Sequence, residues 1–317
     1  MTTTAMKGET GRVAVVGSLN MDLVIRAPRL PNAGETLTGR SFAKVPGGKG
    51  GNQAVAAARL GAQVAMIGRV GNDDNGAQLV AGLRCEGIDC DGVATDAAQP
   101  TGVAMIVVDD AGQNAIVIVA GSNGALAPEA VSKHEAAIAQ ADVVVCQLEV
   151  PDETVLAAMR AARALGRTVV LNPAPVTGAL SRTWLELADY LIPNEVEASA
   201  LSGIQVDSPE SAQRAAEVLQ TQGARNVIVT LGAQGVLLLE AGGEAPRGRH
   251  YPPRKVVAID TTAAGDTFVG GFSAALAAKR PLDEAVRFGQ AAAALSVTRA
   301  GAQTSIPFLR EISLASD

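Results

Sequence analysis

The stretch DTTAAGDTF at residues 260–268 holds the residue types best suited to phosphate chemistry. Ala263, Ala264 and Gly265 are small, and they open an Ala- and Gly-rich segment that predicts a helix. Uncovered N–H groups and the helix dipole at such an end attract an anion such as phosphate. Asp266 in that position is either a stabiliser of the helix start or a base beside a reacting phosphoryl group. Position alone favours the stabiliser by roughly two to one.

A second candidate is the glycine-rich stretch PGGKGGNQ at residues 46–53, which leads into a predicted helix. Glycine lets the backbone approach a ligand closely. The stretch is not a Walker A loop, because Lys49 is followed by Gly50 rather than by Ser or Thr. A surface turn would have the same composition, so the motif alone leaves ligand binding and turn formation both open.

Polar residues also follow predicted strands, which is where an open α/β sheet binds its ligands. Asn20 and Asp22 lie two apart and would face the same way in an extended chain, so they could hold neighbouring hydroxyls of a sugar. A turn that favours Asn and Asp would look the same. The stretch TLGAQG at residues 230–235 could contact a nucleotide or turn a hairpin into Val236–Leu239.

Asn194 and Glu197 follow the predicted strand Tyr190–Ile192 and lie on one face of a first helical turn. Their oxygens suit a Mg²⁺ ion that keeps most of its water ligands. The same pair would also form a helix capping box, and both interpretations can hold together.

The elements that must position these residues alternate along the chain. Short Val- and Ile-rich runs predict strands at Val13–Val16, Val64–Ile67, Asp142–Cys146, Thr168–Leu171, Tyr190–Ile192, Val227–Leu231 and Val256–Ile259. Helix-period stretches lie between them, at Asn52–Leu60, Asn75–Glu86, Pro128–Gln140, Pro151–Leu165 and Pro209–Gln222. This rhythm predicts the α/β class, with a doubly wound, mostly parallel sheet and helices on both faces.

Two extended segments without a helical period, Leu23–Val45 and Thr101–Val119, interrupt the rhythm. The second reads as strand, turn and strand over Val103–Val108 and Ala115–Val119, which is a hairpin signal. We expect both segments to pair into a small antiparallel sheet that protrudes from the main domain. Such a sheet could be a lid over the ligand crevice or an embellishment of its edge.

Composition narrows the class of protein. The chain has 317 residues, of which 48% are hydrophobic, so it can bury a sizeable core. A net charge of −6 and 3% aromatic residues disfavour nucleic-acid binding. Three cysteines make a disulfide framework improbable, and His134 and His250 are expected on the surface. The polar N-terminus and the absence of any apolar run near about 18 residues predict a cytoplasmic protein without a membrane span.

Together the motifs resemble the ribokinase-like family of carbohydrate kinases, in the right order from about Val13 to Pro307. The resemblance rests on GGKGGNQA at residues 47–54, NPAP at 172–175, DTTAAGD at 260–266 and TRAGAQTS at 298–305. Gly51 stands where alanine is common in such kinases, and Gln290 stands where some have histidine near the adenine. The resemblance implies a single kinase domain with a small β lid, which phosphorylates D-ribose at its 5-hydroxyl with ATP.

The resemblance also assigns roles residue by residue. Asp266 would be the general base, and the amides around Ala263, Ala264 and Gly265 would form the anion hole. The ribose-binding positions would be Asn20, Asp22, Gly48, Lys49, Asn52, Glu149 and Asp266. The nucleotide-binding positions would be Asn194, Thr230, Gly232, Gly235, Gly265 and Gln290. Glu197 would be linked to Mg²⁺.

A monovalent cation, normally K⁺, is a further implication of the resemblance, and it would lie beside the anion hole. Its ligands would come from Asp260, Thr262, Ser296, Arg299, Gly301 and Ser305. Oxygen-only ligation suits a hard cation, and Arg299 could give only its carbonyl. This would explain why Asp260 is acidic without being the base. The lid segments would also form a homodimer interface.

Three alternatives remain at this point. The chain could be a related kinase for deoxyribose or fructose, although contacts of Asn20 and Asp22 with the 2- and 3-hydroxyls disfavour deoxyribose. A catalytically silent sugar-binding regulator would be expected to have lost Asp266. An NAD-dependent oxidoreductase needs a glycine fingerprint after the first strand, which GSLN at residues 17–20 does not supply.

Overall fold

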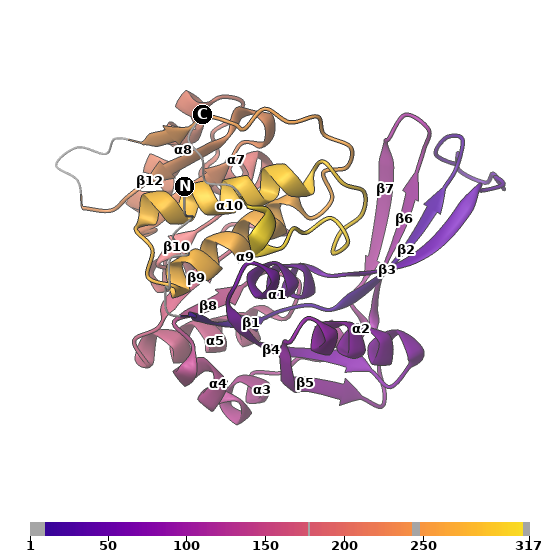
Figure 1. The fold of residues 1–317 in the computed structure, drawn as a ribbon, viewed down its shortest axis with the longest axis horizontal. Helices are drawn as coiled ribbons and strands as arrows, with labels where there is room; N and C mark the ends of the chain where they lie inside the picture. The colour runs from indigo at the N-terminus through magenta and orange to yellow at the C-terminus, as the bar shows by residue number, and fades with distance from the viewer. Residues whose placement is uncertain (1–9, 177, 243–247, 313–317) are drawn as a thin grey trace, which may run out of the picture.

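The computed structural model describes residues 10–176, 178–242 and 248–312. The strands of its main sheet are β1 (Arg12–Val16), β4 (Gln63–Gly71), β5 (Asp89–Asp96), β8 (Val143–Cys146), β9 (Thr168–Leu171), β10 (Tyr190–Leu191), β11 (Asn226–Thr230), β12 (Val236–Leu239) and β13 (Arg249–Tyr251). They pair in the order β13-β12-β11-β10-β9-β8-β1-β4-β5 (Figure 1). Every pairing from β11 to β5 is parallel, and β12 and β13 add an antiparallel edge. The predicted fold class is confirmed.

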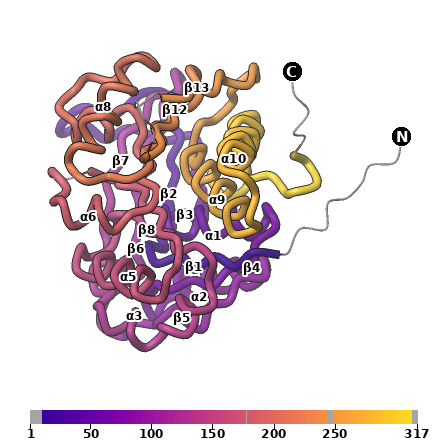
Figure 2. Tube along the Cα trace, turned by 90° about the vertical axis from the view of Figure 1, so that its left-hand side faces the viewer, coloured from indigo at the N-terminus to yellow at the C-terminus, as the bar shows by residue number. Residues whose placement is uncertain are grey.

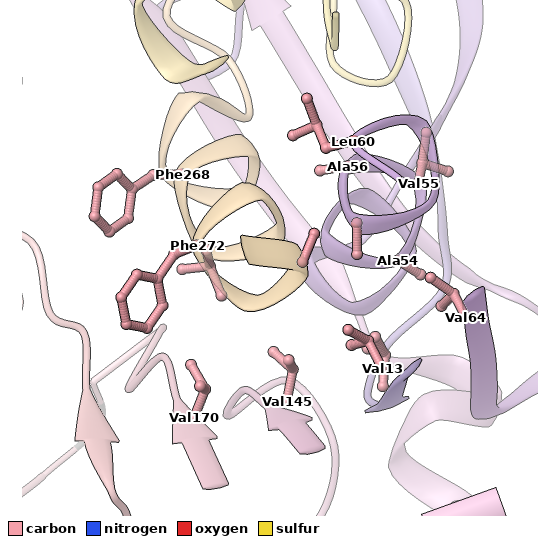
Figure 3. Close-up of a cluster of buried hydrophobic side chains, with 14 of the residues drawn as sticks. Val13, Ala54, Val55, Ala56, Leu60, Val64, Val145, Val170, Phe268 and Phe272 are labelled. Atoms are coloured by element: carbon pink, nitrogen blue, oxygen red, sulfur yellow. The ribbon is translucent and has the colours of Figure 1, made fainter. Parts of the chain in front are cut away.

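Helices cover both faces of this sheet, because successive residues of each buried strand point to opposite sides. On one face Val13, Val145 and Val170 pack against apolar side chains of two crossing helices (Figure 3). The helices of that face are α1 (Lys49–Arg59), α2 (Asp74–Cys85), α9 (Ala264–Ala277) and α10 (Leu282–Ser296). The helices of the opposite face are α3 (Glu129–Lys133), α4 (Glu135–Gln140), α5 (Asp152–Ala164), α6 (Arg182–Leu187), α7 (Glu195–Ser202) and α8 (Pro209–Gln222). Figure 2 shows α9 and α10 on one side and α5, α6 and α8 on the other.

Glycine at position 270 lets α1 and α9 cross at close range. A Cβ atom added to Gly270 would lie 2.5 Å from the Cβ of Ala56 and 2.7 Å from the carbonyl oxygen of Gln53. A larger residue would therefore push the two helices apart. This close crossing brings the first turn of α1 beside the first turn of α9.

A second, four-stranded sheet stands out from one side of the body (Figure 1). Its strands are β2 (Asn20–Arg26), β3 (Ser41–Gly47), β6 (Gly102–Val108) and β7 (Asn114–Val119), in the order β3-β2-β6-β7. The two outer pairs are antiparallel, as expected, whereas β2 and β6 run parallel. The central pair is parallel because β2 follows β1 and β6 follows β5, and both leave the main sheet in the same direction.

Four further details differ from the sequence predictions. Val256–Ile259 is not a strand, and its Val257 and Ile259 are exposed. The physical reason is that Pro252 and Pro253 follow β13 directly, and proline cannot donate to a strand ladder. Conversely β5, with the sequence DCDGVATD, was not predicted, because this edge strand carries few apolar residues.

The helix predicted over Pro128–Gln140 is two short helices, α3 and α4, divided at His134. The helix predicted from Asn52 begins earlier, at Lys49, so the glycines beside Lys49 belong to its first turn. Within the described ranges, no helix is long and apolar enough to cross a membrane. Short 3₁₀ turns complete the chain at η1 (Gly121–Ala125), η2 (Gly232–Gln234) and η3 (Leu309–Glu311).

Candidate active site

A cleft of about 170 Å³ lies beyond the carboxyl ends of the central strands, where ligands of open α/β sheets bind. Lys49 at the start of α1 and Thr230 at the end of β11 line it. Asn194 and Glu197 line it from the start of α7, and Asp266 lines it from the start of α9. Residues from four separate motifs of the sequence therefore share one cleft.

The N-terminus of α9 is open to this cleft. Ala263 precedes the helix in the left-handed conformation, with φ of 59°, which costs a non-glycine residue about 1–2 kcal/mol. A Cβ atom added to Gly265 would meet nothing within 4 Å, so this turn borders free space. Strained backbone of this kind is typical of functional sites, and the first N–H groups of the helix are available to an anion.

Asp266 is buried in the first turn of α9, and only 8% of the residue is exposed. Its Oδ2 accepts a hydrogen bond of 2.9 Å from Nδ2 of Asn52. Its Oδ1 accepts one of 2.9 Å from Nε2 of Gln53. Both donors are adjacent residues near the start of α1, so the crossing of α1 and α9 fixes the orientation of this carboxylate.

Lys49 is the cation at the centre of several carboxylates. Burial by itself lowers the pKa of the Lys49 ammonium, but Asp266, Glu149 and Glu197 raise that pKa above its ordinary value. Lys49 therefore keeps its positive charge inside the cleft, where it can attract a phosphate group.

Asp22 in β2 is a partly buried carboxylate beside two other acidic residues. Burial, the charge of Glu149 and the charge of Asp266 together raise the pKa of Asp22 to about 7. A Cβ atom on Gly47 would lie 2.3 Å from Oδ2 of Asp22, so glycine at this position makes room for the carboxylate. A neutral ligand that is rich in hydroxyl groups could donate hydrogen bonds to Asp22 and to the carboxylates beside it.

Glu149 is held next to the start of α1. Its Oε2 accepts hydrogen bonds from Oγ of Ser18 at 2.5 Å and from the backbone N–H of Lys49 at 3.0 Å. Asn20 is buried, and its Oδ1 accepts a 2.7 Å hydrogen bond from Nδ2 of Asn123. Gly48 has φ of 82°, and a Cβ atom there would lie 2.7 Å from the backbone nitrogen of Asn20. The predicted sugar-side residues therefore lie together around the junction of β2, β3 and α1.

Asn194 and Glu197 form the predicted capping box of α7. The side chain of Asn194 accepts from the N–H of Glu197 at 2.8 Å, and Oε2 of Glu197 accepts from the N–H of Asn194 at 2.9 Å. Burial raises the pKa of the Glu197 carboxyl, although the N–H of Asn194 and the charge of Lys49 oppose the rise. Thr230 pairs with Asn194 in an isolated parallel bridge, which ties β11 to this corner of the cleft.

The remaining nucleotide-side predictions lie around the end of β11. Gly232 and Gly235 both have positive φ, 48° and 94°, and they form the turn that leads into β12. Gln290 in α10 donates from Nε2 to the backbone oxygens of Tyr251 and Pro252. Gln290 thereby anchors the start of the irregular segment 252–262.

Asp260 joins the end of that segment to the C-terminal part of the chain. Its Oδ1 accepts from the N–H and the hydroxyl of Thr262, and its Oδ2 accepts from the N–H of Gly301 at 2.8 Å. Burial raises the pKa of the Asp260 carboxyl, but these hydrogen bonds outweigh burial and lower that pKa below its ordinary value.

Among the predicted cation ligands, Ser296 and Ser305 are fully buried, and their hydroxyls donate to the carbonyls of residues 293 and 302. Arg299 pairs through its side chain with Glu311, which leaves only its carbonyl for a cation.

Sequence reasoning assigned no role to a set of buried polar residues in and around the cleft. The missed residues are Ser18, Gln53, Asn123, Gln147 and Asn172. Each follows a strand end or lies in the glycine-rich motif, which is the same positional signal that singled out the others. Their roles depend on burial, which a single sequence does not display.

Comparison with known proteins gives an independent result. Residues 10–309 match the model of the pfkB family of carbohydrate kinases. The chain belongs to this family. A ribokinase from Haemophilus influenzae is 46% identical over 299 residues, which cover 94% of this chain and 96% of that protein. A deoxyribokinase from Salmonella typhi is 36% identical over 299 residues, which cover 94% of this chain and 96% of that protein.

A solved structure gives the same relationship at the level of the fold. The structure of Arabidopsis thaliana ribokinase complexed with ribose and ATP superimposes with a TM-score of 0.88. The match has 32% sequence identity and covers 96% of this chain and 97% of that one. The chain is thus a kinase of the pfkB family, and the cleft is the candidate active site of such an enzyme.

Proposed function

We propose that the chain transfers the γ-phosphoryl group of ATP to the 5-hydroxyl of D-ribose. One observation carries this proposal: the buried Asp266 carboxylate, held by two amides, lies at the open N-terminus of α9 and lines a cleft with Lys49. A base, an anion-binding helix end and a cation within one cleft are what phosphoryl transfer requires.

Asp266 has the role of general base in this proposal. It accepts the proton of the 5-hydroxyl as the sugar oxygen bonds to the γ-phosphorus and the bond from that phosphorus to ADP breaks. The N–H groups near Ala263, Ala264 and Gly265 hold the transferring phosphoryl group. The family resemblance reverses the two-to-one preference for a helix stabiliser, and the hydrogen bonds that Asp266 accepts from amides of α1 support the role of base.

The sugar is proposed to bind on the β2 and α1 side. Asn20, Asp22 and Glu149 accept from ribose hydroxyls, and Gly48, Lys49 and Asn52 complete the site. The buried positions of Asn20 and Asn52, and the partly buried carboxylates of Asp22 and Glu149, support a ligand rich in hydroxyl groups.

The nucleotide is proposed to bind on the other side of α9, against Asn194, Thr230, Gly232, Gly235 and Gln290. Bound Mg²⁺ would neutralise charge on the phosphates. The donor set fits such an ion: the described residues hold no group of three or more His, Cys, Asp or Glu for a protein-only metal site, and Glu197 offers one carboxylate at the cleft. Mg²⁺ of this kind is held through water and substrate phosphate.

A monovalent cation, K⁺, is proposed to be bound by Asp260, by Ser296 and Ser305, and by backbone carbonyls of Thr262, Arg299 and Gly301. Support comes from Asp260, whose carboxylate already links Thr262 to Gly301. Oxygen donors of this type suit a hard cation. The ion would order the turn that precedes α9.

The small sheet is proposed to be a lid and a homodimer interface. Six large apolar side chains of this sheet are exposed: Phe42, Met105, Ile116, Val117, Ile118 and Val119. A second copy would cover an edge strand that is otherwise open to solvent.

A cytoplasmic location accords with the cysteines Cys85, Cys90 and Cys146, which are all free thiols.

An ADP-release assay over D-ribose, 2-deoxy-D-ribose, D-fructose and other pentoses and hexoses tests the proposal. We expect the highest kcat/KM for D-ribose. Deoxyribose is the second candidate, because a deoxyribokinase matches the chain over nearly its full length. Ribose is preferred because Asp22 and Asn20 would lose a hydroxyl partner in the deoxy sugar. A higher kcat/KM for any other sugar would overturn the choice of ribose.

A further inference from the structure

Three amide side chains lie buried behind Asp266. Gln53 comes from α1, Gln147 directly follows β8, and Asn172 directly follows β9. Gln53 and Gln147 have no exposed surface, and 9% of Asn172 is exposed. Buried amides are costly unless their hydrogen bonds are made, and an apolar side chain could fill the same space.

These amides form a branched chain of hydrogen bonds, in which one branch ends on Asp266 and the other on the carbonyl of Ile192. Gln53 donates from Nε2 to Oδ1 of Asp266 at 2.9 Å and to Oδ1 of Asn172 at 3.1 Å. Its Oε1 accepts from Nε2 of Gln147 at 2.7 Å. Asn172 in turn donates to the backbone oxygen of Ile192 at 2.9 Å.

The chemistry of a carboxylate fixes the direction of this chain. An ionised carboxylate can only accept, so Gln53 must turn its NH₂ group toward Asp266. Both hydrogens of that group are then used, and Oε1 remains for Gln147. One arrangement of donors and acceptors satisfies Gln53 completely.

Gln147 is held in place by close packing against Gly17. Its Oε1 is one of the buried polar atoms without a hydrogen-bond partner among the described residues. A Cβ atom on Gly17 would lie 2.0 Å from that oxygen, so only glycine in this strand end leaves room for the amide. The NH₂ group of Gln147 is thereby kept on Oε1 of Gln53.

We propose that Gln53 is a positioning residue for Asp266, and that Gln147 and Asn172 hold it in its donating orientation. The proposal rests on Asp266 being the base of the proposed function. Gln53 fixes Oδ1 and Asn52 fixes Oδ2, so the carboxylate keeps one orientation toward the cleft.

The main test is the variant Gln53→Met, which keeps the length of the side chain and removes both donors. We expect kcat to fall by about 10–150-fold, the range for losing a hydrogen bond to a charged group, with both KM values within twofold of the parent. The acid limb of the kcat profile should move to higher pH, because a lost donor disfavours the ionised carboxylate. Thr154→Val is the matched control: it removes a buried hydrogen bond, from Thr154 to the carbonyl of Leu126, and should change neither quantity.

A site-specific titration measures the midpoint of Asp266 separately from those of the ionisable groups around it, and it needs no sugar. The ionisable groups that face it are Lys49 of α1, Asp22 of β2 and Glu197 of α7. Carbon-13 NMR of the Asp266 carboxyl, assigned with Asp266→Asn, should show a higher titration midpoint in Gln53→Met than in the parent. A parent without activity on ribose would refute the proposed substrate, while this midpoint would still test the network.

Gln147→Met is the second variant, and it keeps the test decisive should Gln53→Met fail to fold. It should shift the Asp266 midpoint in the same direction by a smaller amount, because Gln147 acts only through Gln53. A folded Gln53→Met with the parent's kcat and Asp266 midpoint would overturn the proposal. So would a loss confined to KM, or, where only Gln147→Met folds, an unchanged midpoint in that variant.

Discussion

The two sides of the cleft are built in different ways. On the β2 and α1 side, Asn20 and Asn52 belong to regular elements and are less than 10% exposed. On the cation side, Asp260 and Thr262 end the irregular segment 252–262, in which Val257 is 83% exposed. The first side has its geometry fixed by strand pairing and helix crossing, whereas the second depends on a few hydrogen bonds around Asp260.

This difference teaches where each kind of ligand should exert its effect. Changes on the β2 and α1 side should alter sugar affinity or the chemical step directly, because the groups are already in place. Changes on the cation side should alter how the rate responds to an ion, because the proposed ion would complete the turn that Asp260 holds by hydrogen bonds. The following substitutions would break or sharpen that contrast.

Asp266→Asn should have the largest effect, because the amide cannot accept the proton. We expect kcat to fall by about 10²–10⁴-fold, with binding of ribose and ATP mostly retained. Steady-state kinetics and calorimetry on the purified variant measure both. Asp74→Asn is the matched control, since Asp74 lies in the first turn of α2 and is exposed. A kcat near that of the parent in Asp266→Asn would remove Asp266 from the mechanism.

Asp22→Ala should weaken ribose binding while ATP binding stays the same. The lost charge-assisted hydrogen bond corresponds to roughly 1.5–3 kcal/mol, or about 10–150-fold in affinity. Calorimetry with each ligand separates the two affinities. Asp110→Ala, in the exposed turn of the small sheet, serves as the control. Equal ribose affinity in Asp22→Ala and the parent would refute the assignment of the sugar side.

Asp22 should also give the stability of the protein a recognisable pH dependence. Its pKa is raised from 3.8 to about 7 in the folded protein, so the folded state binds the extra proton between these values. The contribution of this group to the free energy of unfolding therefore falls as the pH rises from about 4 to 7. Asp22→Asn should raise the free energy of unfolding at pH 8 by about 1–2 kcal/mol. Urea denaturation at pH 5 and pH 8 checks this, and a gain at pH 5 as large as at pH 8 would contradict it.

The cation side should show a smaller, severalfold effect on the rate. At constant ionic strength, KCl should raise kcat more than NaCl does, because general screening is then equal in both salts. Asp260→Ala should abolish the difference between the salts and leave the protein folded. Equal rates of the parent in K⁺, Na⁺ and a bulky organic cation would contradict the proposed cation site.

The buried strands were predictable because their signal is local. Runs such as Val143–Cys146 and Thr168–Leu171 are apolar on both faces, and burial on both faces is what a central parallel strand requires. The edge strand β5 lacked that signal. Val256–Ile259 has an apolar run of the same kind but is not a strand, because the prolines after β13 take the chain away from the sheet.

The site was predictable only in part, for a related reason. Residues such as Asp22 and Asn194 stand out because polar types follow apolar runs at the strand ends. Gln53 and Gln147 do not, because an amide in a sequence looks the same whether it faces solvent or an aspartate on another helix. The contact of Gln53 with Asp266 depends on the crossing of α1 and α9, which brings together residues 213 positions apart, and Gln147 reaches Asp266 only through Gln53.

The identity of the phosphorylated atom tests the central claim most directly. Phosphorus-31 NMR of the reaction of the purified chain with ATP and D-ribose should show a phosphomonoester whose phosphorus couples to the two protons on C5. The signal should appear with the parent and with Asp74→Asn, and at a rate lower by at least about 10²-fold with Asp266→Asn. A product phosphorylated at another carbon, or the same product formed at the parent's rate by Asp266→Asn, would contradict the account.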